Sequence, residues 1–383
     1  MSFEFATATR IIFGAGKLGE AGALAAGMGS HALVVESGSG RAGALIALLH
    51  EHGVATTSLR VTGEPTTTLV EQGAARARRD GCDLVIAFGG GSVIDAGKAV
   101  AALITNRAPL RDYLEVVGEA RPLTERSAPF IAIPTTAGTG AEVTRNAVLM
   151  VEDARVKVSL RSPFMLPAIA LVDPELTYSL PPAITASTGL DALTQCIEPF
   201  VSPRGNPLTD GIAREGMRRA AGALRRAFHD GADVDARSDM CVASLCGGLS
   251  LANAKLGAVH GFAAPLGGMF PLPHGVICAR LLPYVVAVNV RALLERERKS
   301  PALVRYDEVA RILTSDTEAR AEDAVAWLRA LVDELAIPRL GTFGVRAEDV
   351  PGVAAQARKA SSMQGNPIAL TDDELVDILG AAL

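Results

Sequence analysis

The chain has 383 residues, which is too long for one ordinary hydrophobic core and predicts two domains. A hydrophobic share of 49% excludes a disordered chain, and 37 basic against 42 acidic residues, with no basic run, argue against a nucleic-acid partner. Its most apolar stretches, such as Asp83–Phe88 and Leu281–Val288, are far shorter than the roughly 20 residues that span a bilayer. We therefore expect no membrane segment.

The N-terminus and the cysteines both favour a cytoplasmic protein. The first ten residues, MSFEFATATR, lack the basic start and apolar run of a secretory signal. The cysteines form no CxxC motif and show no dense spacing, so we expect reduced, mostly buried thiols rather than disulfides. They are Cys82, Cys196, Cys241, Cys246 and Cys278.

The first half of the chain alternates two patterns. Short runs rich in β-branched residues end in glycine or a polar turn, and they lie at Ala32–Glu36, Asp83–Phe88, Phe130–Pro134 and Ala168–Asp173. Segments with helical periodicity lie between them, such as Thr68–Asp80 and Val93–Ile104. Repetition of strand, turn and helix predicts an α/β domain with a parallel sheet covered by helices, over residues 1–180.

From about Pro181 the chain changes character. Pro181 and Pro182 open this half, and proline is tolerated in a first helical turn. Long segments of Ala and Leu follow, broken by Pro and Gly, at Ala183–Phe200, Pro207–Ala227, Arg237–Ala254, Pro301–Leu313 and Ala321–Glu334. This pattern predicts an all-α domain over residues 181–383.

Three loops that follow predicted strands have the composition of ligand-binding turns. Gly38–Gly43 fits G-x-G-x-x-G, and Gly89–Ser92 separates a strand from a helix whose positive N-terminus attracts anions. The third loop is Pro134–Glu142. Each loop alone could be a simple tight turn, but the carboxyl ends of parallel strands meet at one edge of a sheet, where such folds bind ligands.

A second set of candidate residues lies in the helical half. Asp191 and Gln195 are four residues apart on a predicted helix and share a face, whereas Glu198 could equally be a surface charge. His260 and His274 lie in glycine-rich, apolar surroundings. One carboxylate and two imidazoles form a common ligand set for zinc or ferrous iron, and the alternative is two buried structural histidines with a capping aspartate.

Taken together, these residues resemble the iron-containing (group III) alcohol dehydrogenase family over essentially the whole chain. The resemblance rests on the following segments: Arg10–Gly16 (RIIFGAG), Gly89–Asp95 (GGGSVID), Pro134–Thr144 (PTTAGTGAEVT), Thr188–Leu193 (TGLDAL), His260-Gly261, Pro273–Gly275 (PHG) and Gly365–Pro367 (GNP). The resemblance implies a Rossmann-like N-terminal domain that holds NAD or NADP, a helical C-terminal domain and a cleft between them.

The resemblance also implies roles for individual residues. The Gly89–Ser92 loop would hold the pyrophosphate, and Asp95 would cap or orient this loop rather than bind phosphate. Thr135, Thr136 and Lys157 would line the nicotinamide and ribose. The Gly38–Gly43 loop would then lie on the adenosine side. The cofactor-binding residues expected on this basis are Ser37, Gly89, Gly90, Gly91, Ser92, Asp95, Thr135, Thr136, Thr139 and Lys157.

At the reaction centre the chain departs from the family pattern of one aspartate and three histidines. Asp191, His260 and His274 are expected to be catalytic and to bind Fe²⁺ or Zn²⁺, but Gln195 occupies the position of the third histidine and would be a weak fourth ligand. A further histidine that is frequent in the family, and could relay protons, is Ala264 here.

The resemblance implies an NAD(P)-dependent alcohol dehydrogenase or aldehyde reductase that acts on small alcohols and aldehydes. It also implies a cytoplasmic homodimer. In this chemistry a metal ion stabilises the negative charge that grows on the substrate oxygen while hydride is transferred. Two alternatives stay open. One is a metal-independent enzyme similar to maleylacetate reductases, and the other is a catalytically silent dinucleotide-binding protein.

Overall fold

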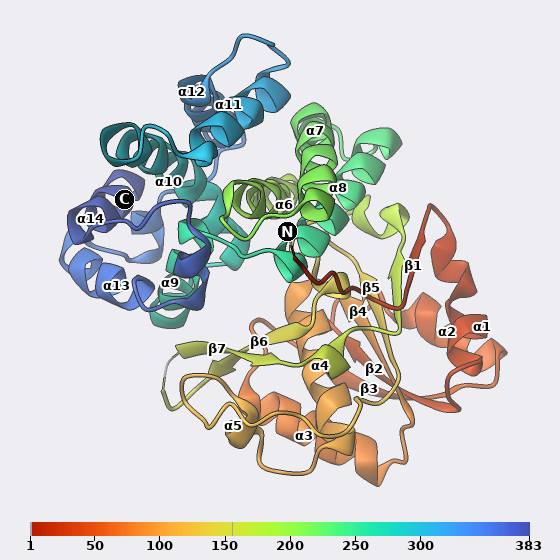
Figure 1. The fold of residues 1–383 in the computed structure, drawn as a ribbon. Helices are drawn as coiled ribbons and strands as arrows, with labels where there is room; N and C mark the ends of the chain where they lie inside the picture. Colours follow the sequence, from red (N-terminus) through yellow and green to blue (C-terminus); the bar gives the residue numbers. More distant parts are fainter. Residues whose placement is uncertain (1, 155) are drawn as a thin grey trace. The chain divides into compact units, whose positions relative to one another are not determined.

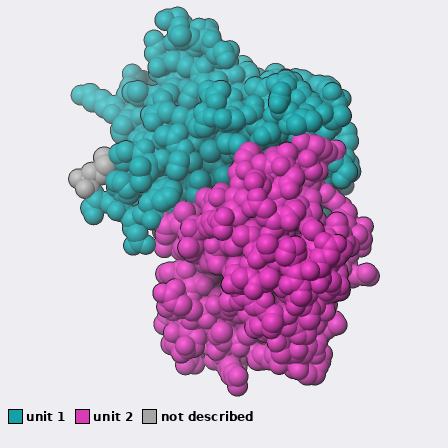
Figure 2. All heavy atoms as spheres, turned by 90° about the vertical axis from the view of Figure 1, so that its right-hand side faces the viewer, with its two compact units in different colours: residues 1–5, 137–139, 179–383 teal, residues 6–136, 140–178 magenta. Residues whose placement is uncertain are grey.

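A computed structural model describes residues 2–154 and 156–383. The chain divides into two compact units, which are coloured in Figure 2. The sheet unit consists of residues 6–136 and 140–178, and the helical unit consists of residues 1–5, 137–139 and 179–383. The short segment 137–139, which belongs to the loop after a predicted strand, is thus grouped with the helical unit.

The sheet unit is built on six strands that are all parallel (Figure 1). They run in the order β1-β8-β5-β4-β2-β3. Their bounds are β1 (Arg10–Phe13), β2 (His31–Glu36), β3 (Ala55–Arg60), β4 (Leu84–Gly89), β5 (Phe130–Pro134) and β8 (Ile169–Val172). The four strands expected from sequence are present within one residue of their predicted ends, and the α/β fold is confirmed.

Helices cover both faces of this sheet. Val34 and Ile86 pack on one face with α1 (Ala21–Ala26) and α2 (Gly43–Glu51), whereas Val35 and Val85 pack on the other with α3 and α4. The bounds of the latter are α3 (Thr67–Arg79) and α4 (Gly91–Thr105). Because neighbouring strand residues point to opposite faces, a strand covered on both sides reads as a continuous apolar run, as β4 does.

Two parts of the sheet unit were not expected from sequence. The strands β1 and β3 escaped prediction because β1 is short and β3, ATTSLR, is largely polar. An antiparallel hairpin, β6 (Asn146–Val151) with β7 (Val156–Arg161), follows the third loop, and α5 (Leu110–Tyr113) is a single turn. The hairpin alternates buried and less buried residues, which is the pattern of a sheet with one covered face.

The helical unit contains nine α-helices among the described residues. They are α6 (Pro182–Val201), α7 (Pro207–His229), α8 (Val234–Asn253), α9 (Ala258–Met269), α10 (His274–Arg296), α11 (Pro301–Thr314), α12 (Ala321–Glu334), α13 (Val350–Ala357) and α14 (Asp372–Ala382). The five long helices expected from sequence are present. Helices α9 and α10 were not expected, because each contains a proline and α9 is rich in glycine.

By length and composition, α10 could cross a membrane, which differs from the expectation based on the shorter run Leu281–Val288. In its most apolar window 83% of the residues are buried within the protein, as in the core helix of a soluble domain. All five cysteines are free and buried, as expected.

Candidate functional site

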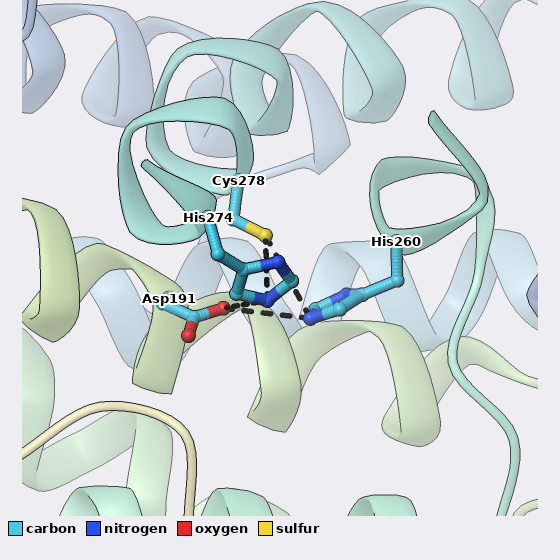
Figure 3. Close-up of side chains that lie close together, drawn as sticks. All are labelled: Asp191, His260, His274 and Cys278. Carbon is cyan, nitrogen blue, oxygen red and sulfur yellow. Dashed lines mark hydrogen bonds and ion pairs between the residues drawn. The ribbon is translucent and has the colours of Figure 1, made fainter. Parts of the chain in front are cut away.

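Four side chains converge in the helical unit, and Figure 3 shows them pointing toward one another. Asp191 lies in the middle of α6, His260 in the first turn of α9, and His274 and Cys278 in the first turns of α10. One ligand atom from each lies within 4.8 Å of the other three. We call these four residues the ligand cluster. The structure therefore brings together the three residues that were expected to be catalytic.

The carboxylate of Asp191 carries the clearest sign of a missing partner. Its Oδ1 is buried and accepts no hydrogen bond from any described residue. The Nε2 atoms of His260 and His274 lie 3.4 and 3.7 Å from it, which is close enough for electrostatic attraction but too far for a good hydrogen bond. A divalent cation among these atoms would satisfy the oxygen, so the residues present fit a metal ion.

Glu198 holds His260 in place from the side opposite the cluster. Its Oε2 lies 2.6 Å from Nδ1 of His260, so Nε2 is left to face Asp191 and Cys278. The carboxylate is buried, and the surface-charge reading of Glu198 was wrong. A carboxylate behind a histidine in this way fixes its tautomer and raises its basicity toward a metal.

The start of α9 is fixed by side chains from distant parts of the chain. The amide of Val259 donates to Oε1 of Glu198 at 2.7 Å, and the amide of Ala258 donates to Oδ1 of Asn366 at 3.2 Å. These two acceptors satisfy backbone donors that a helix N-terminus otherwise leaves unpaired. A Cβ at Gly257 would lie 2.9 Å from Oε1 of Glu198, so only glycine allows this approach.

The charges of the cluster are strongly coupled. Burial opposes protonation of His260, but nearby Cys278, Glu198 and Asp191 outweigh burial and hold its pKa well above the ordinary value. Burial would also raise the pKa of Asp191, yet the two imidazoles hold it below the ordinary value. Burial raises the pKa of Cys278 to about 12. The surroundings thus favour positive charge among these ligands, which a bound cation would supply.

The two departures from the family pattern lie beside the cluster. Gln195 is buried one turn after Asp191 on α6, and its Oε1 also accepts no hydrogen bond from a described residue. The side chain lies against α8, where a Cβ added at Gly247 would be 3.4 Å from that oxygen. Ala264 lies in α9, one turn after His260, and has no group that could relay a proton.

Sequence reasoning missed Cys278, although the signal was present. His274 and Cys278 are four residues apart on one helix and therefore share a face, as Asp191 and Gln195 do. In the same way Glu198 follows Asp191 by seven residues on α6, which returns it to the same side. For Glu198 the alternative of a surface charge stayed open, and the spacing of Cys278 from His274 was not used.

In the sheet unit, two of the three candidate loops meet. Gly89 and Pro134 are paired at the ends of β4 and β5, and the amide of Thr135 donates to the carbonyl of Gly89. Gly90 precedes α4, and a Cβ placed there would lie 3.3 Å from Oγ1 of Thr136. Gly91 and Ser92 form the first turn of α4, whose N-terminus suits an anion.

Both carboxylate oxygens of Asp95 contact neighbouring groups. Its Oδ2 accepts from the amide of Val148 at 3.0 Å, and Oδ1 lies 3.2 Å from Nζ of Lys98. Nζ of Lys98 is buried and donates to Oγ1 of Thr144 at 2.7 Å and to the carbonyl of Asn146 at 2.6 Å. These contacts tie α4 to the hairpin.

The remaining cofactor candidates lie apart along the chain. Ser37 is exposed after β2, where its hydroxyl donates to Ser39, and the neighbouring Glu36 lies 3.6 Å from Arg60. Lys157 on β7 forms an ion pair of 2.9 Å with Glu64 and is nearly buried. Thr139 belongs to the segment grouped with the helical unit.

Comparisons with known proteins cover both units. A family model for iron-containing alcohol dehydrogenase matches residues 8–174, and a model for the C-terminal domain of the same family matches residues 185–383. A 4-hydroxybutyrate dehydrogenase from Cupriavidus necator is 38% identical over 309 residues, which is 79% of this chain and 78% of that protein.

Solved structures agree with these matches. The structure of a 1,3-propanediol oxidoreductase has a TM-score of 0.91 and 33% identity, and each chain is covered completely. A sulfoacetaldehyde reductase from Bifidobacterium kashiwanohense, solved in complex with NAD⁺, has a TM-score of 0.88 and 28% identity, covering 100% of this chain and 99% of that one.

Proposed function

The chain belongs to the iron-containing alcohol dehydrogenase family, and from this premise we propose that it interconverts an alcohol and its aldehyde or ketone by hydride transfer with NAD(P), assisted by a divalent metal. Membership makes it an oxidoreductase of small alcohols and aldehydes. The observation that carries the metal-assisted mechanism is the unsatisfied Oδ1 of Asp191 facing His260 and His274.

Asp191, His260 and His274 would hold the metal. A bound ion supplies a Lewis acid beside the substrate oxygen, where negative charge grows as hydride reaches the carbonyl carbon. Glu198 keeps Nε2 of His260 directed at this position by holding Nδ1. Three of the cluster side chains are buried and His274 is 36% exposed, so substrate reaches the cluster on the His274 side.

We assign the cofactor to the carboxyl edge of the parallel sheet. The strand order places β2 beside β4 where the connections change direction, which is the position at which open α/β sheets bind ligands. The backbone of Gly89–Ser92 and the N-terminus of α4 would take the pyrophosphate, with Thr135 and Thr136 beside them. Thr135, Thr136 and Lys157 keep the nicotinamide-side role that the family pattern implies, and Thr139 stays a cofactor-binding candidate.

Both NAD and NADP should be accepted. An acid that receives the ribose hydroxyls repels a 2′-phosphate, but the usual acid position is Ser37 here, and the nearby Glu36 is paired with Arg60. The test is the ratio of kcat/KM for the two cofactors. A preference for NAD above about 100-fold, about 2.7 kcal/mol, would contradict the proposal and identify Glu36 as the ribose ligand.

The overall proposal is tested by oxidation of NAD(P)H with a panel of aldehydes and with maleylacetate, on protein assayed for bound metal. We expect aldehyde reduction that is lost on chelation and returns with Zn²⁺ or Fe²⁺. Reduction of maleylacetate that survives chelation would support the metal-independent alternative. Cofactor binding without turnover of any carbonyl would support a silent binding protein.

Two further properties belong to this proposal. Free, buried cysteines support a reducing cytoplasmic setting, and the family pattern supports a homodimer. Light scattering on the eluting peak of a sizing column measures the assembly, and a monomeric mass at assay concentration would refute the dimer.

A further inference from the structure

We propose that Cys278 is the fourth protein ligand of the metal, which makes the site one of aspartate, two histidines and cysteine and makes it select Zn²⁺ over Fe²⁺. This inference rests on the proposed metal site and goes beyond it, because neither the thiol nor a preference for zinc was expected from the sequence. It starts from the position of the sulfur. Sγ of Cys278 lies 3.7 Å from Nε2 of His260 and 3.6 Å from Nε2 of His274.

The spacing of the four ligand atoms is that of a tetrahedron around zinc. With bonds of about 2.0–2.2 Å to N or O and about 2.3 Å to S, tetrahedral geometry separates O and N by about 3.4 Å and N and S by about 3.6 Å. The observed separations are 3.4 and 3.7 Å from Asp191 Oδ1 to the two imidazoles, and 3.7 and 3.6 Å from the imidazoles to the sulfur. Four of the six edges agree with this geometry, and all four ligand atoms lie within 4.8 Å of one another.

A second observation is independent of the cysteine. Oδ1 of Asp191 is buried and has no hydrogen bond to any residue in the described part of the chain, although a buried carboxylate oxygen needs a partner. The sulfur belongs to the same arrangement, because Cys278 follows His274 by one turn of α10. By contrast, the buried thiol of Cys196 in α6 contacts the carbonyl of Ala243, which is ordinary packing for a cysteine.

The choice of metal follows from the thiolate. Sulfur is a soft ligand that favours Zn²⁺ over Fe²⁺, and sites of mixed N and S ligands with tetrahedral geometry are typical of zinc. Gln195 would contribute only a neutral amide oxygen, which is a weaker ligand than a thiolate. The thiolate therefore restores the strength that the site loses at Gln195.

The sulfur–metal bond can be observed directly in the full-length protein. Cobalt-substituted protein should show the intense near-ultraviolet charge-transfer absorption that a thiolate gives and that imidazole or carboxylate ligands do not. X-ray absorption of the zinc form should show one sulfur at about 2.3 Å. Both measurements are made on the wild type, so they decide the question even where a variant fails to fold.

Variants then identify the sulfur. Cys278→Ser should lose the charge-transfer band and bind Zn²⁺ at least about 100-fold more weakly, since even the loss of a group behind a ligand costs 10–100-fold. Cys246→Ser, which removes another buried thiol of the helical unit, and Gln195→Ala should both keep the band. Zinc should also displace bound Fe²⁺ more readily from the wild type than from Cys278→Ser, because the thiolate adds to the general preference of such sites for zinc.

Three results would overturn the inference, and they are distinguishable. Bound metal with no sulfur neighbour in the wild type refutes Cys278 as a ligand and leaves the proposed metal-assisted function standing. A band that survives in Cys278→Ser but disappears in Cys246→Ser assigns the sulfur elsewhere. Failure of the wild type to bind Co²⁺ or Zn²⁺ refutes the metal site itself, and with it both proposals.

Discussion

Each unit buries a group of charged side chains, but only one of the two groups is complete. In the sheet unit, Lys98 donates to Thr144 and Asn146 and pairs with Asp95, whose other oxygen accepts from the amide of Val148. In the helical unit, the buried Oδ1 of Asp191 accepts no hydrogen bond from the residues that the structure describes. A buried charge is costly unless it is paired, so the first group is a brace within the protein, and the second fits the metal ion that we propose.

The largest expected effect is on the incomplete group. Asp191→Asn removes the only carboxylate of the ligand cluster, so the metal should be lost and kcat/KM for aldehyde reduction should fall at least about 10³-fold, beyond the loss of a single oxyanion donor. The matched control is Asp95→Asn, the carboxylate of the complete group, which should keep its metal. Metal content and turnover of both variants are the measurements. Equal metal content in Asp191→Asn and Asp95→Asn would show that Asp191 is no more important for metal binding than Asp95.

The second prediction breaks the complete group. Lys98→Met keeps the length of the side chain but leaves the buried carboxylate of Asp95 without its cation. Removing one partner of a buried ion pair costs about 3–5 kcal/mol, so the free energy of unfolding should fall by that amount. Urea unfolding measures it, with metal content expected to match the wild type. A loss below about 1 kcal/mol would mean that Lys98 is not a brace.

The third prediction concerns how the stability of the protein depends on pH through a buried glutamate beside the group of Lys98 and Asp95. Burial raises the pKa of Glu142, near Lys98, to about 7, against an ordinary value of 4.5. Folded protein therefore keeps a proton that the unfolded chain releases, so wild-type stability should fall as pH rises from about 4.5 to 7 and then level off.

Glu142→Gln should be free of this loss. Its stability relative to the wild type should increase by up to about 3 kcal/mol between pH 4.5 and 7 and stay constant above pH 7. Unfolding of both proteins in the presence of a chelator, at a series of pH values, excludes any contribution from the metal. Parallel stability curves for the two proteins would place the pKa of Glu142 near its ordinary value.

The smallest expected effect is on the support behind a ligand. Glu198→Gln keeps an acceptor for Nδ1 of His260 but removes the negative charge, so Zn²⁺ affinity should fall by about 10–100-fold. Competition with a chromophoric chelator measures this. Glu215→Gln changes a partly exposed glutamate of α7 in the same unit; it is the matched control and should leave the affinity unchanged. An unaltered Zn²⁺ affinity in Glu198→Gln would mean that Glu198 only caps the start of α9 and does not support metal binding.

The sequence was informative where a function depends on neighbours along the chain. The glycine loop after β4 was predicted because strand, loop and helix follow one another within one segment, and the parallel sheet follows from repetition of that pattern. Asp191, His260 and His274 could be named from residue type and family resemblance. Their convergence within 4.8 Å is a property of three helices and no spacing in the sequence reveals it.

What the sequence did not reveal depends on contacts between distant segments. Glu198 could equally have been a surface charge, because its partner, His260, lies on another helix. Asn366 gave no hint of its role, since it acts on the start of α9. The strand β3 is polar in sequence, and it forms because β2 offers it a free edge to pair with.

The hydrogen bond between Asn366 and the start of α9 also has a consequence for the order in which the site forms during synthesis. Synthesis proceeds from the N-terminus, so every residue of the ligand cluster is made before Asn366 exists. Until that residue arrives, the helix that carries His260 has an unpaired first amide and lacks one of its two anchors. We therefore expect tight capture of the proposed metal to be a late step, and a chain that ends before Asn366 to hold the metal poorly.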